Sequence, residues 1–93
     1  MSSHPPAYAV PFVIDRSLAP RLYRLVNMGD EVVRGLRVTL LGSGLLVPVS
    51  ATCLAPGSRL TLTIVGSDLS RDSIVVVRWF RPDGDEYLWR FSF

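Results

Sequence analysis

IVVVRWFRPDGDEYLWRFSF, from Ile74 to Phe93, is the stretch that decides the fold. Two runs rich in β-branched and aromatic residues flank Pro82-Asp83-Gly84. Proline presets φ at the first turn position, and glycine accepts the left-handed conformation at the third. We therefore predict an antiparallel hairpin of Ile74–Arg81 and Asp85–Phe93, closed by a type I turn with a G1 bulge.

This turn fixes which residues of the hairpin face each other. It predicts one face that forms the core, with the pairs Arg81–Asp85, Trp79–Tyr87, Val77–Trp89 and Val75–Phe91. A two-residue turn at Asp83-Gly84 would instead place Arg78 opposite Trp89 and bury two arginines among aromatic rings. Because burying unpaired charges is costly, we reject that register.

The opposite face of the hairpin is the candidate functional site. It carries an apolar patch of Ile74, Val76, Phe80 and Leu88 rimmed by Arg78, Arg90 and Glu86, a composition typical of protein interfaces. The predicted interface residues are Val76, Arg78, Phe80, Leu88 and Arg90. Phe80 would be the central anchor and Arg78 or Arg90 the orienting charge. The alternative is that another strand, the N-terminal segment or a loop covers this patch within the chain.

The remaining sequence also reads as short β-type runs with no sustained helical periodicity. We expect about seven strands, which begin near Tyr8, Arg21, Val32, Leu46, Ser58, Ile74 and Asp85. Pro11 and Pro48 place the first strand and the Leu46–Thr52 strand at sheet edges, since proline donates no ladder hydrogen bond. The predicted fold is all-β, an immunoglobulin-like antiparallel β-sandwich, with a flexible tail over residues 1–6 and one domain over residues 7–93.

Local patterns add detail to this fold. Alternation in Val32–Leu41 turns Leu36, Val38 and Leu40 to one face and Arg37 and Thr39 to the other. Leu60, Leu62 and Ile64 point inward in the same way. Gly29 is expected to supply a positive φ after Asn27, Pro56-Gly57 to form a type II turn, and residues 66–72 to form a polar connection of up to one helical turn.

Three segments resemble bacterial immunoglobulin-like domains of the CARDB and related fibronectin-like type. They are Leu25-Val26-Asn27-Met28-Gly29-Asp30-Glu31, Leu36-Arg37-Val38-Thr39-Leu40 and Leu54-Ala55-Pro56-Gly57-Ser58. Those domains show an Asn-x-Gly turn after the second strand and a Leu-x-Pro-Gly turn before the fifth. The resemblance covers about residues 21–93 and implies a sandwich fold and a non-catalytic adhesion, spacer or interaction role. It transfers no functional residue.

Composition narrows the classes of function. The 93 residues are 48% hydrophobic and 19% charged, which is rich in apolar side chains for one small domain, so some of them must face outward. All ten basic residues are arginine against eight acids, which suggests a G+C-rich genome, and a net charge of +2 is too weak to predict nucleic-acid binding. Cys53 is the only cysteine, which excludes an intrachain disulfide, and we expect it to be a small buried hydrophobe.

No pattern for catalysis or for a cofactor is present. The only histidine, His4, lies in the predicted tail, and Asp68, Asp72, Asp83, Asp85 and Glu86 flank turns without the spacing of a calcium loop. The sequence therefore predicts no enzyme, no cofactor, no metal and no small-molecule substrate. It shows neither a signal-peptide pattern nor ~18 consecutive apolar residues, so we expect a cytoplasmic protein without membrane insertion, or part of a larger particle.

Three functional hypotheses follow. The leading one is a protein–protein interaction or scaffolding module that self-associates or binds a partner through the outer face of the hairpin. The second is a structural subunit of a larger particle, such as a virion decoration or secretion-apparatus component. The third is a carbohydrate or nucleic-acid binder that uses Tyr8, Tyr23 or exposed aromatic residues. Arg78 and Arg90 near Phe80 and Tyr87 resemble the platform of single-strand nucleic-acid binders, but we favour a solvated sheet face whose arginine stems cover apolar neighbours.

Overall fold

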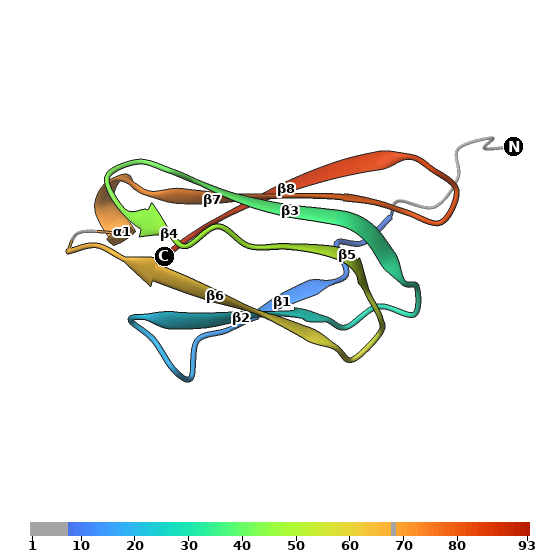
Figure 1. Ribbon diagram of the computed structural model, residues 1–93, viewed down its shortest axis with the longest axis horizontal. Coiled ribbons are helices and arrows are strands. Elements are labelled where there is room, and N and C mark those ends of the chain that lie inside the picture. The colour runs from blue at the N-terminus through green and yellow to red at the C-terminus, as the bar shows by residue number, and fades with distance from the viewer. Residues whose placement is uncertain (1–7, 68) are drawn as a thin grey trace, which may run out of the picture.

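Two antiparallel four-stranded sheets pack face to face in the computed structural model, which describes residues 8–67 and 69–93 (Figure 1). The first sheet has the order β1-β2-β6-β4 and consists of β1 (Phe12–Asp15), β2 (Leu22–Asn27), β6 (Arg59–Val65) and β4 (Leu45–Leu46). The second sheet has the order β5-β3-β7-β8 and consists of β5 (Ser50–Leu54), β3 (Val33–Leu41), β7 (Ile74–Phe80) and β8 (Glu86–Ser92). This arrangement confirms the predicted all-β sandwich. The predicted tail over residues 1–6 lies outside the described residues.

The strands differ from the prediction at two places. The first strand begins at Phe12, after Pro11, and not near Tyr8. The single strand expected over Leu46–Thr52 is two strands, β4 and β5, which belong to opposite sheets. Pro48 lies between them, where the chain crosses from one sheet to the other, and the backbone N–H of Val47 donates to the carbonyl of Thr63 (3.0 Å). Since proline ends pairing, it separates two short edge strands instead of lying within one. The expectation that Pro11 marks an edge is confirmed, because β1, which begins directly after Pro11, is an edge strand of the first sheet.

The C-terminal hairpin has the predicted register. The backbone N–H of Arg81 donates to the carbonyl of Asp85 (3.0 Å), the N–H of Gly84 donates to the carbonyl of Arg81 (2.9 Å), and Gly84 has a φ of 93°. Val75, Val77 and Trp79 consequently face Phe91, Trp89 and Tyr87. The turn chemistry therefore determines which side of β7 is buried.

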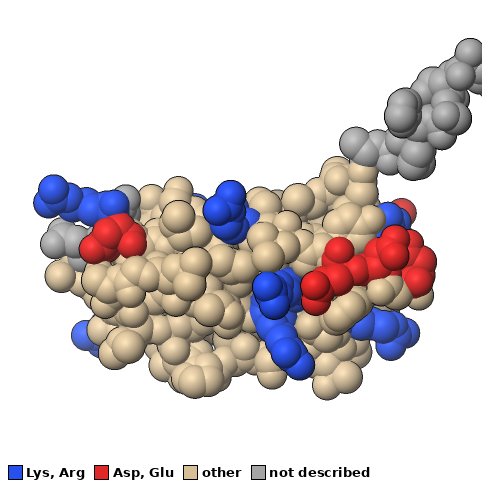
Figure 2. Space-filling view, turned by 90° about the horizontal axis from the view of Figure 1, so that it is seen from above, with Lys and Arg blue, Asp and Glu red and all other residues tan. Residues whose placement is uncertain are grey.

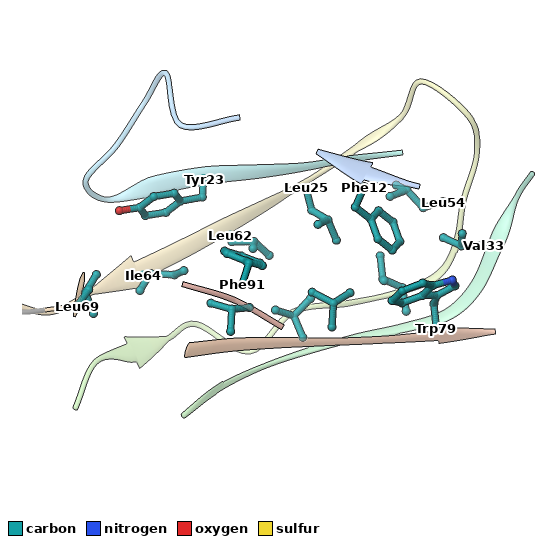
Figure 3. Packing of buried hydrophobic residues seen from close by; sticks show 14 residues of the cluster. Phe12, Tyr23, Leu25, Val33, Leu54, Leu62, Ile64, Leu69, Trp79 and Phe91 are labelled. Atoms are coloured by element: carbon teal, nitrogen blue, oxygen red, sulfur yellow. The ribbon is translucent and has the colours of Figure 1, made fainter. Parts of the chain in front are cut away.

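The core lies between the two sheets (Figure 3). Leu25, Leu62 and Ile64 of the first sheet and Val75 and Val77 of the second are fully buried. Trp79 is 1% exposed and meets the ring of Phe12 edge-on, with 4.8 Å between the ring centroids. The one-turn helix α1 (Leu69–Asp72), expected as part of the connection before β7, buries Leu69 at the end of this core.

A β-bulge at Gly35 was not predicted. The pairing of β3 with β7 shifts by one residue between Arg34 and Arg37, and Gly35 has a φ of 56°. Strict alternation would turn Val33 and Leu36 to opposite faces, but the bulge lets both point into the core, where they are 1% and 0% exposed. It also places the ring of Phe80 directly against Gly35. A Cβ added at Gly35 would lie only 2.9 Å from Phe80 Cδ2.

The turn after β2 works differently from the prediction. Gly29 is not among the glycines with a positive φ; a Cβ at this position would lie 2.8 Å from the Cβ of Pro11, so close packing requires glycine here. Asn27 is fully buried, and its Nδ2 donates to the carbonyls of Glu31 and Leu54 (both 2.9 Å) while its Oδ1 accepts from the N–H of Gly29. This side chain therefore joins the loop after β2 to the last residue of β5 at one end of the sandwich. The type II turn at Pro56-Gly57 is confirmed by a φ of 80° at Gly57 and a 3.0 Å bond from the N–H of Ser58 to the carbonyl of Ala55.

Gly35→Ala should lower the free energy of unfolding by roughly 1–3 kcal/mol, because it strains a left-handed residue and displaces the Phe80 ring. Gly57→Ala is the matched control: Gly57 also has a positive φ, but nothing lies within 4 Å of the added Cβ. We expect this control to cost only about 1 kcal/mol. Chemical denaturation of both variants measures the difference, and equal losses would contradict the contact between Phe80 and the bulge.

Candidate interaction surface

The strand register brings the five predicted interface residues onto one solvent-facing side of the second sheet. Val76 pairs with Arg90, Arg78 with Leu88, and Phe80 with Glu86. Arg78, Phe80, Leu88 and Arg90 are exposed, and Val76 is half-buried. These five residues therefore lie on β7 and β8, the two strands of the hairpin that the sequence predicts.

Strand β3 adds a third row of side chains that the sequence analysis had not placed there. Arg37 stands opposite Arg78, Thr39 opposite Val76, and Leu41 opposite Ile74, while Arg34 stands opposite Phe80. The alternation of apolar and polar residues in this segment predicted that Arg37 and Thr39 point away from the core. No local sequence pattern, however, indicates that β3 pairs with β7. We call the whole surface the arginine face; it consists of Arg34, Arg37, Thr39 and Leu41 of β3, Ile74, Val76, Arg78 and Phe80 of β7, and Glu86, Leu88, Arg90 and Ser92 of β8.

The arginine face is apolar as well as basic. The exposed fractions are 53% for Leu41, 51% for Leu88, 39% for Ile74 and 38% for Phe80. A shallow groove of about 550 Å³ crosses it, lined by Thr39, Leu41, Val76, Arg78, Leu88 and Arg90. Large side chains that remain exposed beside a groove are typical of binding surfaces.

The arginines of this face have no carboxylate partner among the residues that the structure describes. The two ion pairs found there are elsewhere, between Arg24 and Asp15 (3.9 Å) and between Arg81 and Glu31 (2.9 Å). Arg37 and Arg78 face each other on adjacent strands, and like charges in that position repel. Figure 2 looks onto this side of the molecule and shows basic side chains in its middle, with a larger group of acidic side chains beside them toward one end and a smaller group at the other end. Within the described part of the chain, the arginines of this face are therefore not paired with carboxylates.

A second cluster lies around Arg81 at the end of the hairpin. Arg81 Nε and Nη2 donate to Oε1 and Oε2 of Glu31 (3.0 and 2.9 Å), and its guanidinium lies 4.0 Å from the ring centroid of Tyr8. Trp79 Nε1 donates to the hydroxyl of Tyr8 (3.3 Å). The hydrogen bonds to Glu31 are the main reason why the pKa of Arg81 is raised above its ordinary value.

This cluster holds the segment before β1 in place. A cavity of about 470 Å³ adjoins it, lined by Tyr8–Val13, Met28–Glu31 and Arg81. Because the guanidinium is already bonded to a carboxylate and stacked on a ring, we read the cluster as a structural clamp. The sequence analysis had missed it: Arg81 was placed only as the partner of Asp85 in the hairpin.

Asp15, at the end of β1, has a pKa below its ordinary value. The main cause is the backbone N–H of Ser17, which donates to its carboxylate (2.9 Å), and the nearby Arg24 acts in the same direction. These contacts are those of a turn and do not form a reactive centre.

The aromatic residues considered for ligand binding face inward. Tyr23 is 5% exposed and packs edge-on against Phe93. Tyr87 lies on the core side of β8, 4.7 Å from the ring centroid of Tyr8, so it is not beside Arg78 and Arg90 on the outer face. Phe80 is the aromatic residue that the hairpin offers outward.

Cys53 is exposed, so the expectation that it is buried was wrong. It lies in β5, the edge strand next to β3, and the register sets it opposite Arg34 on the outer side. Leu54, the next residue, takes the inward position with 6% exposure. No local pattern distinguishes the inward from the outward one of these two neighbours before the pairing of β5 with β3 is known.

The folded protein should therefore react with a thiol reagent such as Ellman's reagent at a rate within about tenfold of the denatured protein, since the exposed thiol needs no opening of the fold. Stopped-flow absorbance measurements in buffer and in denaturant compare the reaction rates of the folded and the denatured protein. Protection of the folded thiol by several orders of magnitude would show that β5 has a different register.

Groups for metal binding or membrane crossing were also sought in residues 8–67 and 69–93. Within these ranges no three His, Cys, Asp or Glu side chains converge to hold a metal ion, and no helix is long and apolar enough to span a bilayer.

Comparison of the chain with protein-family models, with curated proteins and with solved structures found no match. The resemblance to CARDB-type domains thus has no support from a family model, and the β-sandwich itself is what the structure shows.

Proposed function

We propose that this chain is a non-catalytic protein–protein interaction or scaffolding module that acts through the arginine face. The observation that carries the proposal is the row of arginines for which residues 8–67 and 69–93 supply no carboxylate partner, set among exposed Leu41, Phe80 and Leu88. Isolated exposed apolar residues are normal on any protein, but a contiguous patch interleaved with arginine has the composition of an interface. A protein partner that supplies carboxylates and apolar side chains would satisfy both features.

The strand order supports an immunoglobulin-like assignment within this proposal. Immunoglobulin constant-type sandwiches arrange their strands as A-B-E-D and C-F-G. The orders β1-β2-β6-β4 and β3-β7-β8 have the same neighbours, with β5 as an additional strand beside β3. Such sandwiches serve many functions, so the fold adds no specific role to that of the face.

A single-stranded nucleic acid is a weaker candidate for this face. Such ligands stack successive bases on several aromatic side chains. Phe80 is the one aromatic side chain among the residues of the arginine face, and its ring is packed on Gly35. A protein partner accounts better for the exposed leucines.

Site-specific photo-crosslinking in cells of the native host tests the proposal. A photoreactive benzoylphenylalanine replaces Leu88 on the arginine face, and the matched control carries it in place of Val13 on the other sheet. The two positions have almost the same exposure, 51% and 52%. We expect a discrete protein adduct from position 88 and none from position 13. Absence of an adduct at both positions, or the same adducts at both, would contradict the proposal.

A further inference from the structure

We propose that the outer edge of β8 pairs with the β8 strand of a second copy of this chain, antiparallel and about a two-fold axis at Leu88. The second sheets of the two copies would then form one continuous sheet, with both arginine faces on the same side. This inference goes beyond the proposed function, because it concerns the edge of the sheet and holds whatever the arginine face binds.

β8 is the least protected of the edge strands. β1, β4 and β5 are four, two and five residues long, and each lies within two residues of a proline. β8 has seven residues, contains neither proline nor lysine, and pairs with β7 without a register shift. No strand within residues 8–67 and 69–93 pairs with its other side. Proteins commonly keep edge strands short or interrupt them with proline, lysine or a bulge, so a long regular edge offers a place for a further strand.

Alternate residues of β8 direct their backbone groups to this edge. The N–H of Arg81 donates to the carbonyl of Asp85 across the hairpin. Because bonded and non-bonded pairs alternate along antiparallel strands, the odd-numbered residues of β8 bond to β7. The even-numbered residues therefore point their N–H and C=O groups outward. Ser92 agrees with this, since its carbonyl accepts a hydrogen bond from Nη2 of Arg16 (3.1 Å).

The sequence of β8 is complementary to itself when the strand direction is reversed. Glu86-Tyr87-Leu88-Trp89-Arg90 carries opposite charges two positions on either side of Leu88, and aromatic rings one position on either side. In antiparallel pairing centred on Leu88, Glu86 of each copy stands opposite Arg90 of the other on the exposed face. Tyr87 stands opposite Trp89 on the inner side, where both rings are half-buried. Opposite charges and aromatic pairs are the neighbours that stabilise adjacent strands.

The same charges select this register. Moving the axis by one residue toward either end of the strand would set Leu88 opposite Arg90 or opposite Glu86. Each charge would then lack an opposite charge in the facing strand. The pairing centred on Leu88 also leaves the carbonyl of Ser92 free to keep its bond with Arg16. Two charges that would hinder most incoming strands therefore favour a second copy in one arrangement.

The contact is small. The five residues from Glu86 to Arg90 extend about 17 Å along the edge. Stable interfaces bury about 800 Å² on each partner, and pairing along one strand covers less than that. We therefore expect a weak, concentration-dependent dimer with a dissociation constant above about 1 μM.

Sedimentation equilibrium with exchanged charges tests the pairing and its register. Wild-type protein should be in monomer–dimer equilibrium over about 10 μM to 1 mM. Glu86→Arg alone and Arg90→Glu alone should each weaken the dimer at least about tenfold, since each homodimer then contains two like-charge pairs. The double variant with both substitutions should regain the wild-type affinity, because opposite charges meet again. Both side chains are exposed, and circular dichroism checks that each variant is folded.

Leu88→Pro separates pairing along the edge from a contact between faces. The N–H of Leu88 points away from β7, so proline at this edge position leaves the hairpin bonds in place. It removes the hydrogen bonds between copies at the two-fold axis, and we expect the dimer to be lost. Leu88→Thr is the matched control, because it also shortens the side chain but keeps the N–H, and its dimer should remain within about tenfold of the wild type.

Three results would overturn this inference. They are a strict monomer over the whole concentration range, a dimer whose affinity the double variant does not restore, and a dimer that persists in folded Leu88→Pro. If Leu88→Pro does not fold, the charge variants alone decide. A photo-crosslink from position 88 to a different protein, together with a strict monomer, would reject the pairing of copies and leave the proposed function standing.

Discussion

The register of the hairpin β7–β8 is the constraint on which the rest of this structure depends. Because side chains alternate along a strand, a slip of one residue would exchange the buried and exposed sets completely. The turn at Pro82-Asp83-Gly84 prevents that slip through the 3.0 Å bond between Arg81 and Asp85. This register buries Val75, Val77 and Trp79 in the core and leaves Arg78 of the outer face exposed to solvent. The pairing of β7 with β8 therefore determines both the core of the fold and the candidate site.

The bulge in β3 adjusts the neighbouring strand to that hairpin. With one extra residue at Gly35, Val33 and Leu36 both reach the core, and Arg34 and Arg37 both stay outside. The outer side thereby collects arginines from β3 and β7 side by side, a repulsive arrangement that the folded chain tolerates at solvent exposure. Such tolerated repulsion has a natural explanation if the face meets carboxylates of a partner. The clamp of Arg81 on Glu31 and Tyr8 shows how an arginine of this chain behaves when a carboxylate is within reach.

The parts of the fold that local chemistry controls were predictable from the sequence. Turn residues and alternation predicted the hairpin, the inward side of β3 and β6, and the turn at Gly57. Pairings between distant segments were not, because nothing near Arg37 indicates that Arg78 lies beside it. For the same reason Cys53 was placed in the core and β4 and β5 were merged across Pro48. The sequence does contain a sign of the bulge. Val33 and Leu36 are apolar residues three positions apart with Gly35 between them, which breaks the two-residue alternation of a regular strand. The candidate site was therefore found in two of its three strands, and the arginines of β3 were added only by the structure.

Cross-strand nuclear Overhauser effects between the backbone protons of β7 and β8 test the central claim most directly, which is that the register of this hairpin sets both the core and the outer face. The account predicts that these contacts join Val75 with Phe91, Val77 with Trp89, and Trp79 with Tyr87. Contacts shifted by one residue, which would place Arg78 opposite Trp89, would contradict it.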